Sequence, residues 1–475
     1  MSAPSNRLSG RVRPIFTEDA RPRSAARFTR TLTALIVVLA VLCGLFVGLG
    51  YLQGPKLSKG TVDTDAVVGQ SGQQLRLFVN QVVAPVNAKQ VTITPNVAHK
   101  VTSQGGLIAV QFDARLKYRT DYHVRVSGVT SVDRGTPSTL EYSFTTGSPN
   151  IYYLDRGSPN DRIMRARLDA SPPTVVYSTR RIQDFALLEG ALAVVTLSEH
   201  NESSLDLVSL SDGAVEHVAL PNHVVIQKVD AAAGSSTFGF TLTSTGDSIR
   251  PPYSSTLFTL DLSGSHTIKP VVGLNGKPLL VLDWEYMPDG SSLLALTHDR
   301  SLFMVDPKTP GSVLPLGQFN ELGSISRDGK IATVSDAFGL ISLKLDNLRQ
   351  ERLVPSPFDE GEPYLGLTEY LPGGERVEKL LSIEPDGIRF ASTVALDNGK
   401  KSQVLYRTPN DDGSIQNFSV SPNGQYVAVE VIPNVTTSMS DGYYYDSHST
   451  STTTVFVDID SGNVVKSVEG FDLSW

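Results

Sequence analysis

Cysteine is nearly missing from this chain of 475 residues, which contains only Cys43. Because Cys43 lies inside an apolar run, the rest of the chain cannot form disulfide bonds. Secreted eukaryotic proteins commonly depend on such bonds, whereas Gram-positive bacterial envelope proteins often do without them. If most of the chain lies outside the cell, its cysteine content therefore favours a bacterial protein.

Basic residues are scarce beyond the N-terminus. Residues 1–30 hold seven arginines and two acidic residues, a net charge of +5, and because the whole chain carries −8 the remainder carries −13. Nucleic acids and other polyanions require a basic surface, so the acidic remainder argues against a nucleic-acid partner. The basic N-terminus instead suits a cytoplasmic tail beside anionic lipid.

Motifs of catalysis are missing as well. The chain has no Gly-x-Ser-x-Gly nucleophile turn, no His-Glu-x-x-His zinc helix and no Cys/His cluster. These absences argue against a prolyl-peptidase-like hydrolase and a zincin-type metalloenzyme. The histidines are scattered, and we interpret the pair His217 and His223 as a strand end and a loop. We predict no catalytic residue, no bound metal and no cofactor, although a cation held by inward carboxylates cannot be read from spacing.

The uncharged run Leu32–Leu52 is the most informative feature present. As a helix its 21 residues extend about 32 Å, enough to cross a hydrocarbon core of about 30 Å. The arginines before it predict a cytoplasmic N-terminus and about 420 residues outside. We expect a disordered Arg-rich tail (1–30) and a transmembrane helix (31–54) in contact with membrane lipid. The chain is then a single-pass cell-membrane protein with extracellular C-terminal domains.

Two alternatives to an uncleaved anchor remain open. A cleaved signal peptide has a shorter apolar segment and a small-x-small cleavage site, and the sequence after the run, Tyr51–Pro55, lacks a clean Ala-x-Ala. A lipoprotein would need a small residue before its cysteine, where this chain has Leu42. We therefore interpret Cys43 as an apolar membrane residue.

After the apolar run Leu32–Leu52, no segment repeats apolar residues with the 3.6-residue period of a helix. Apolar segments are short and alternate with polar residues, and 39 glycines and 28 prolines separate them. This pattern predicts an all-β exterior. Its length exceeds one ordinary domain, so we expect two.

The first exterior domain is expected at residues 62–147. Its strand candidates alternate apolar and polar side chains, as in a sandwich with one buried face per sheet. The candidates are Gln74–Asn80, Gln90–Pro95, Leu107–Phe112, Tyr122–Val129 and Leu140–Thr145. The segments Leu75–Pro95, Leu116–Val129 and Tyr142–Gly147 resemble the bacterial SbsA-type Ig-like domain. The resemblance implies an Ig-like spacer in which Tyr122 packs inward.

A loose repeat fills the second expected domain, residues 148–475: an apolar strand, a tight turn ending in glycine, and a second strand. The turn glycines are Gly190, Gly234, Gly290, Gly329, Gly374 and Gly424. Their average spacing is that of one four-stranded propeller blade. The C-terminal Phe471–Trp475 has the pattern of a first strand, and three strand candidates in residues 150–178 complete a seventh blade. We therefore predict a seven-bladed β-propeller closed by both of its ends.

The Ser-Pro-Asn-Gly and Ser-Arg-Asp-Gly turns resemble those of TolB-like and WD-repeat propellers. No blade carries the Gly-His…Trp-Asp signature, so no subfamily is implied. Together the two resemblances point to a bacterial, actinobacterial membrane-anchored protein with an SbsA-type domain before a TolB-like/WD-repeat-like propeller.

Four loop segments are candidate sites. Pro433–Thr454 holds Tyr443, Tyr444 and Tyr445 among small polar residues, a composition typical of adaptable contact surfaces. We predict these tyrosines as binding residues, with a disordered insertion as the alternative. The acidic loop Pro355–Tyr364 is interpreted as a rim or a solvated connection. The Asp-rich turns at residues 410–413 and 458–462 lack a complete calcium-ligand set and are interpreted as β-turns.

The function predicted from these features is that of an extracytoplasmic binding or scaffold protein of the cell envelope. The propeller is the interaction platform, the Ig-like domain is the spacer, and the partner is an envelope protein or polymer. The alternative is an envelope enzyme, a glycan lyase or hydrolase, working in the propeller's central pocket. A third possibility is a sensory partner of a membrane complex, contacted through the Arg-rich tail.

Overall fold

The computed structural model describes residues 23–133, 135–232, 234–246, 252–358, 363–383, 390–408 and 412–475. Most of the predicted cytoplasmic tail, with Arg7, Arg11, Arg13 and Arg21, lies outside these ranges. So do the acidic centre of the Pro355–Tyr364 loop and the first part of the Asp-rich turn at residues 410–413.

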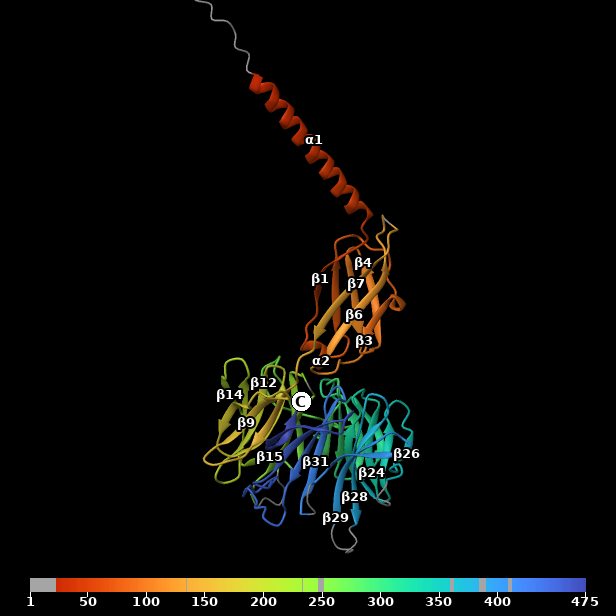
Figure 1. The fold of residues 1–475 in the computed structure, drawn as a ribbon. Coiled ribbons are helices and arrows are strands. Elements are labelled where there is room, and N and C mark those ends of the chain that lie inside the picture. The colour runs from red at the N-terminus through yellow and green to blue at the C-terminus, as the bar shows by residue number, and fades with distance from the viewer. Residues whose placement is uncertain are drawn as a thin grey trace, which may run out of the picture.

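An apolar helix, α1 (Arg23–Leu52), projects from one end of the molecule (Figure 1). Its segment Phe28–Leu45 has a mean hydropathy of 2.1 and is not covered by any other described part of the chain. The helix is long and apolar enough to cross a membrane, as a signal sequence also would be. It begins at Arg23, before the predicted start, because Ser24, Ala25 and Ala26 are compatible with helix.

A β-sandwich of two sheets follows α1. One sheet has the order β1-β2-β5-β4 and the other β3-β6-β7. Their strands are β1 (Leu57–Thr61), β2 (Gln74–Val79), β3 (Val91–Thr94), β4 (His99–Gln104), β5 (Leu107–Phe112), β6 (Asp121–Val129) and β7 (Ser138–Thr145). Two short helical turns, α2 (Ala66–Gly69) and η1 (Ala88–Gln90), lie between them. Burial alternates along β2 and β6, and Tyr122 is 1% exposed and stacks on Phe144 at 5.6 Å between ring centroids.

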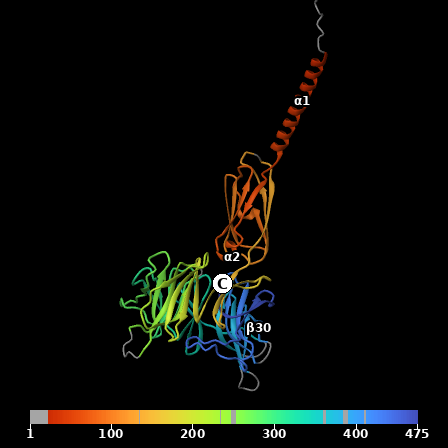
Figure 2. The same cartoon turned by 90° about the vertical axis from the view of Figure 1, so that its left-hand side faces the viewer.

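Seven four-stranded antiparallel sheets, counted within the described ranges, form a β-propeller on the other side of the sandwich (Figures 1 and 2). From the central channel outward, the first three are β11 (Ile182–Leu188), β12 (Ala191–Leu197), β13 (Ser203–Ser209), β14 (Val215–Val218); β15 (Val224–Ala231), β16 (Thr237–Ser244), β17 (Thr256–Asp261), β18 (Lys269–Pro270); and β19 (Val281–Tyr286), β20 (Leu293–Thr297), β21 (Ser301–Val305), β22 (Val313–Gln318). The next three are β23 (Glu321–Ile325), β24 (Ile331–Asp336), β25 (Gly339–Lys344), β26 (Gln350–Arg352); β27 (Tyr364–Tyr370), β28 (Arg376–Ile383), β29 (Phe390–Asp397), β30 (Ser402–Arg407); and β31 (Ser414–Val420), β32 (Tyr426–Ile432), β33 (Thr453–Asp458), β34 (Val464–Glu469).

The seventh blade confirms the predicted closure. Its order is β35-β8-β9-β10, from β35 (Phe471–Ser474), β8 (Asn150–Asp155), β9 (Asp161–Arg167) and β10 (Thr174–Thr179). Phe471 pairs with Leu154 and Ser474 with Tyr152. The C-terminal strand thus joins the N-terminal strands of the same ring, and the predicted all-β fold with one N-terminal apolar helix is correct.

The turn after each inner strand requires its glycine. Gly424 has φ +72°, and a Cβ there would lie 2.9 Å from Cδ of Pro372 in the neighbouring blade. Gly190 has φ +75° but open space around it. Both positions need left-handed backbone, and Gly424 also allows close contact between blades.

Adjacent blades pack through large apolar residues on their inner strands. Trp284 on β19 is 1% exposed and approaches Gly239 on β16, where a Cβ would come within 2.7 Å of its ring. The side chains that flank Trp284, Asp283 and Glu285, point the other way because alternate residues of a strand face opposite sides. Packing between blades therefore places acidic residues on the channel.

The sandwich contacts the turns that follow the inner strands. Arg115 donates from a guanidinium nitrogen to the carbonyl of Pro422 at 3.2 Å, and Asn423 donates from Nδ2 to the carbonyl of Leu116 at 3.0 Å. Tyr118 stacks on Tyr426 with ring centroids 6.1 Å apart. Buried residues of the sandwich and of this part of the propeller belong to one apolar cluster. The two units therefore share a continuous core.

Candidate functional site

The strongest candidate site is the central channel of the propeller, a cavity of about 590 Å³. Its described lining contains seven acidic residues and a single cationic one, Lys228. The acidic residues are Asp184, Asp230, Asp283, Glu285, Glu369, Glu430 and Asp472. They come from six different strands, because the innermost strands of several blades each contribute to one wall.

Lys228 binds one edge of this acidic lining. Its Nζ donates to Oδ1 of Asp283 at 2.9 Å and to the carbonyl oxygen of Trp284 at 2.6 Å. Burial alone would lower the pKa of Lys228, but Asp283, Asp230 and Glu285 outweigh it and raise that pKa. The lysine is therefore held as a cation, and six further acids share the channel with it.

Burial raises the pKa of several channel carboxyls. The pKa of Glu285 rises to about 8 and that of Asp184 to about 7. Burial also raises the pKa values of Asp230 and Glu369, although Lys228 lowers the first and Arg327 the second. Repulsion among neighbouring carboxylates adds to the shift of Glu285. Part of the lining is therefore protonated near neutral pH, and the carboxylates that remain ionised favour a cationic occupant.

The channel has two distinct ends. Trp475 lines the same cavity as Arg115 of the sandwich, and β35 runs from Phe471 towards that end. Asp472, near the start of β35, therefore lies at the end away from the sandwich. The segment 433–452, which connects β32 to β33, packs at this distal end and is called the distal loop below.

The distal loop is folded onto the propeller, contrary to the disordered alternative. The Arg156 guanidinium, on the loop after β8, lies 3.8 Å from the ring centroid of Tyr443 and 2.6 Å from Oδ2 of Asp441. Both charged side chains of that ion pair are almost fully buried. The Tyr443 hydroxyl donates to Asp161, and burial together with this bond raises the Tyr443 pKa.

The three predicted binding tyrosines thus lie in different surroundings. Tyr443 is committed to contacts within the protein, whereas Tyr444 is 73% exposed. Tyr445 packs edge-on against Tyr444 at 4.7 Å between centroids. Their role in binding remains a prediction, with Tyr444 as the one of the three that presents most of its side chain.

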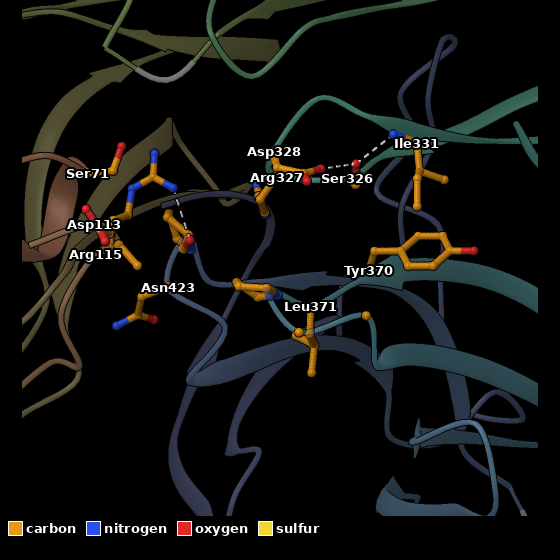
Figure 3. Close-up of a pocket in the computed structure, with 15 residues that line it drawn as sticks. Ser71, Asp113, Arg115, Ser326, Arg327, Asp328, Ile331, Tyr370, Leu371 and Asn423 are labelled. Atoms are coloured by element: carbon orange, nitrogen blue, oxygen red, sulfur yellow. Dashed lines mark hydrogen bonds between the residues drawn. The ribbon is translucent and has the colours of Figure 1, made fainter. Parts of the chain in front are cut away.

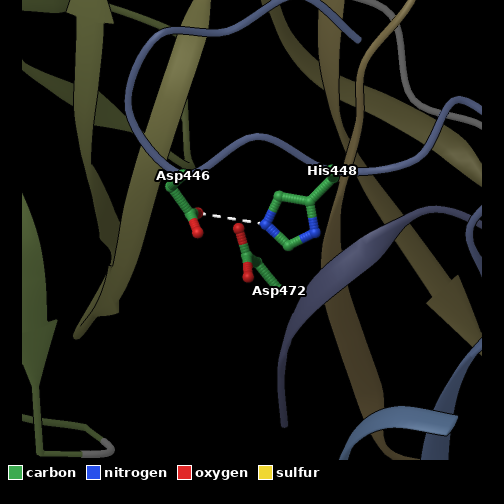
Figure 4. A group of neighbouring side chains, drawn as sticks. All are labelled: Asp446, His448 and Asp472. Carbon is green, nitrogen blue, oxygen red and sulfur yellow. Dashed lines mark hydrogen bonds and ion pairs between the residues drawn. The ribbon is translucent and has the colours of Figure 1, made fainter. Parts of the chain in front are cut away.

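Three residues of types that can bind a metal lie together in the structure, and the sequence did not reveal this group. Asp446, His448 and Asp472 come from the distal loop and β35, and one side-chain ligand atom of each lies within 4.8 Å of the other two (Figure 4). The His448 ring stacks on Phe471 at 3.8 Å between centroids. Spacing along the chain could not reveal this group, because Asp472 reaches it only through blade closure.

A second cavity, of about 530 Å³, lies between the sandwich and the propeller (Figure 3). Arg115 from the sandwich and Arg327 and Tyr370 from the propeller line it. Burial and the nearby Arg327 lower the pKa of Arg115. Arg327 in turn lies 3.6 Å from Glu369. The cavity separates two units that are already joined by direct contacts, so the channel is the better candidate.

The other residues considered from the sequence are engaged locally. His217 lies 2.5 Å from Asp206 and His223 lies 2.7 Å from Glu202, each a separate pair of side chains. In the second Asp-rich turn, Oδ1 of Asp458 accepts hydrogen bonds from the Ser461 backbone and hydroxyl. That pattern is an ordinary turn of aspartate and serine.

The channel acids carried a weak signal in the sequence. Asp184, Asp230, Glu285 and Glu369 precede their turn glycines by four to six residues. Aligning the repeats on their turn glycines would have placed one acid at a similar position in each of these four blades. Within any one strand, the alternation of apolar and polar residues shows only that the position is polar. A single strand therefore could not reveal the cluster of acids.

No protein-family profile matches this chain, and no curated protein sequence matches it. Among solved structures it is similar to TolB from Acinetobacter baumannii, with 16% identity over 81% of this chain and 80% of that chain and a TM-score of 0.35. A putative TolB from Agrobacterium tumefaciens gives 16% identity over 57% and 90% and a TM-score of 0.36. A prolyl endopeptidase gives 12% identity over 69% of this chain and 50% of that chain, with a TM-score of 0.47. At such scores the propeller assignment rests on the sheet topology of this chain itself.

Proposed function

We propose that this chain is a single-pass, membrane-anchored binding protein of the cell envelope. Helix α1 is the anchor with a cytoplasmic N-terminus, the sandwich at residues 62–147 is an Ig-like spacer, and the propeller at 148–475 is the binding platform. Uncovered apolar side chains along α1 and the arginines before it support this orientation. The shared core of sandwich and propeller supports a spacer that holds the platform in a fixed direction.

The acidic channel is the observation that carries the binding role. Seven carboxyl groups around one lysine create a field that attracts positive charge. A basic segment of an envelope protein, or a polymer with cationic groups, is complementary to this lining. The residues after the tail carry a net charge of −13, so the exterior as a whole also favours a positively charged partner.

Topology is tested first with an exposed cysteine. Cys43 is the single cysteine, so a Cys43→Ser background leaves Tyr444→Cys as the one reactive thiol. We expect an impermeant maleimide to label Tyr444→Cys on intact cells and the protein to stay in the membrane at alkaline pH. Labelling only after lysis, or a mature chain that lacks α1, would refute the anchored orientation.

Binding is tested by crosslinking in native membranes with the full-length chain. Substituting Asp230→Asn, Glu285→Gln and Glu369→Gln together removes three carboxyl groups from the channel, and Asp346→Asn, Glu351→Gln and Asp460→Asn remove three carboxyl groups outside it. We expect the channel variant to lose captured partners and the control to retain them. Equal capture by both variants would exclude the channel as the binding site.

An envelope glycan lyase or hydrolase is the second candidate, favoured by the raised pKa values of Glu285 and Asp184. A protonated carboxyl beside an ionised one is the arrangement used for general acid catalysis of glycoside cleavage. The Arg156 and Tyr443 side chains at the distal end are bound to other residues, which leaves carboxyls as the acid and base. Release of reducing ends from purified cell-wall glycan, abolished in Glu285→Gln, would establish the enzyme and displace the binding role.

A further inference from the structure

The group formed by Asp446, His448 and Asp472 has the dimensions of a metal site. Nε2 of His448 lies 3.1 Å from Oδ2 of Asp446. Metal–ligand bonds of about 2.1 Å place neighbouring ligand atoms about 3.0–3.4 Å apart in octahedral or tetrahedral geometry. Two of the three ligands are therefore already at chelating distance, and a small movement of Asp472 would complete the set.

Asp472 supplies an independent sign of a missing ligand. Its Oδ2 is shielded from solvent and accepts no hydrogen bond from any described residue. A buried carboxylate oxygen without a donor is costly, and most such atoms in proteins have a partner. The Asp472 carboxyl is directed towards the space beside Asp446 and the His448 ring (Figure 4). A cation at that position would be coordinated by the Asp472 carboxylate.

Among the described residues, acidic groups outnumber basic ones around Asp472, where Arg156 and His448 face three further acids. Asp184 and Glu430 line the same channel and repel Asp472 together with Asp446. Arg156 lies nearby, but it is committed to Asp441 in a buried ion pair of 2.6 Å. A divalent cation would offset the charge that Arg156 leaves uncompensated.

We propose that Asp446, His448 and Asp472 bind a divalent transition-metal cation at the distal end of the channel. One imidazole nitrogen with two carboxylates suits Zn²⁺ or Mn²⁺, whereas Ca²⁺ and Mg²⁺ favour all-oxygen sites. The metal would tie the distal loop to β35, and so to the strand that closes the ring. This inference does not depend on the proposed binding function, because it concerns the ion and not the partner.

Zn²⁺ is the probe in the test, with the full-length chain in detergent. The protein is stripped with a chelator, loaded with Zn²⁺, desalted and analysed for zinc by mass spectrometry. We expect one zinc per chain, and an increase in Tm of about 3–4 °C at a free zinc concentration about 100-fold above Kd. His448→Ala and Asp472→Asn should each lose both the bound zinc and the increase in Tm.

His217→Ala is the matched control, since it removes a histidine from a similar pair with Asp206 elsewhere on the propeller. It should bind zinc like the original protein. Asp472→Asn also guards against misfolding, because asparagine tolerates the left-handed backbone at this position, φ +51°. No zinc on the original protein, or equal zinc on Asp472→Asn and the original, would overturn the site.

Discussion

The guanidinium of Arg156 lies over the ring of Tyr443, 3.8 Å from its centroid, although 287 positions separate the two residues in the chain. The same guanidinium donates to the carbonyl oxygens of Ile182 and Gln183 at 3.1 and 2.6 Å. Arg156 therefore joins the seventh blade, the blade that begins with β11, and the distal loop. Together with the bond from Tyr443 to Asp161 and the stacking of His448 on Phe471, this side chain holds the distal loop on the propeller.

Removing this link should destabilise the protein strongly. Arg156→Met leaves Asp441 as a buried charge without its ion-pair partner, a change that typically costs about 3–5 kcal/mol. Tyr443→Phe removes only the hydroxyl donor to Asp161 and should cost about 1 kcal/mol, because Asp161 keeps its bond from the Ile182 backbone. Tyr444→Phe is the exposed control and should have no effect. Urea unfolding of the three variants measures this order, and equal stability of Arg156→Met and the original chain would contradict it.

The blade turns allow a comparison of two glycines with nearly the same backbone. Gly190→Ala should lower the free energy of unfolding by about 1–2 kcal/mol, the cost of a left-handed conformation alone. Gly424→Ala bears the same cost and also places its Cβ 2.9 Å from Pro372. We expect Gly424→Ala to be the less stable of the two by at least about 1 kcal/mol. Equal losses in a thermal unfolding series would show that the neighbouring blade yields without cost.

The acidic channel should make stability depend on pH. The pKa of Glu285 rises from 4.5 to about 8 on folding, mainly through burial, so the folded state holds this proton where the unfolded state releases it. The stabilising contribution is complete below about 4.5 and is lost as the pH rises towards about 8. Because Glu285 keeps partial solvent contact, we expect a change of about 1–3 kcal/mol. Glu285→Gln should flatten the profile between those pH values, and an unchanged slope would refute the assignment.

A buried arginine in the blade β27-β28-β29-β30 provides a second test in which the effect on stability depends on pH. Arg376 lies 2.9 Å from Glu378 and 2.5 Å from Asp397, and both carboxyls are fully buried. Burial raises the pKa of Glu378 to about 7, against the lowering effect of Arg376. Arg376→Met should cost about 3–5 kcal/mol at pH 8 and less at pH 5, where Glu378 is protonated. Glu378→Gln, which removes one of two acids that share a single arginine, should be tolerated far better in the same denaturation experiments.

The strands could be predicted because their burial follows from their own sequence. The strand Leu107–Phe112 has the predicted bounds, and its side chains alternate between buried and partly buried positions. The turn at Gly424 and the closing strand at Phe471 could also be predicted. A turn with left-handed φ usually needs a glycine, and a final strand without a following partner is visible in the sequence.

The candidate site could not be predicted in the same way. Lys228 and Asp283 lie on the inner strands of consecutive blades and touch only because these two blades pack side by side in the ring. Asp446 and Asp472 meet because a loop folds over the strand that closes the ring. Tyr443 was expected to face a partner, but its neighbours in sequence gave no sign of Arg156, which lies at the other end of the propeller sequence.

The pairing of β35 with β8 also sets the order of events during biosynthesis. Residues 150–155 leave the ribosome early but cannot complete their sheet until residues 471–474 have followed. Strand β8 therefore keeps an unpaired edge while the strands of the other six blades are synthesised. Until then the open ring is prone to aggregation, and the pairing of β35 with β8 is the step that completes its fold.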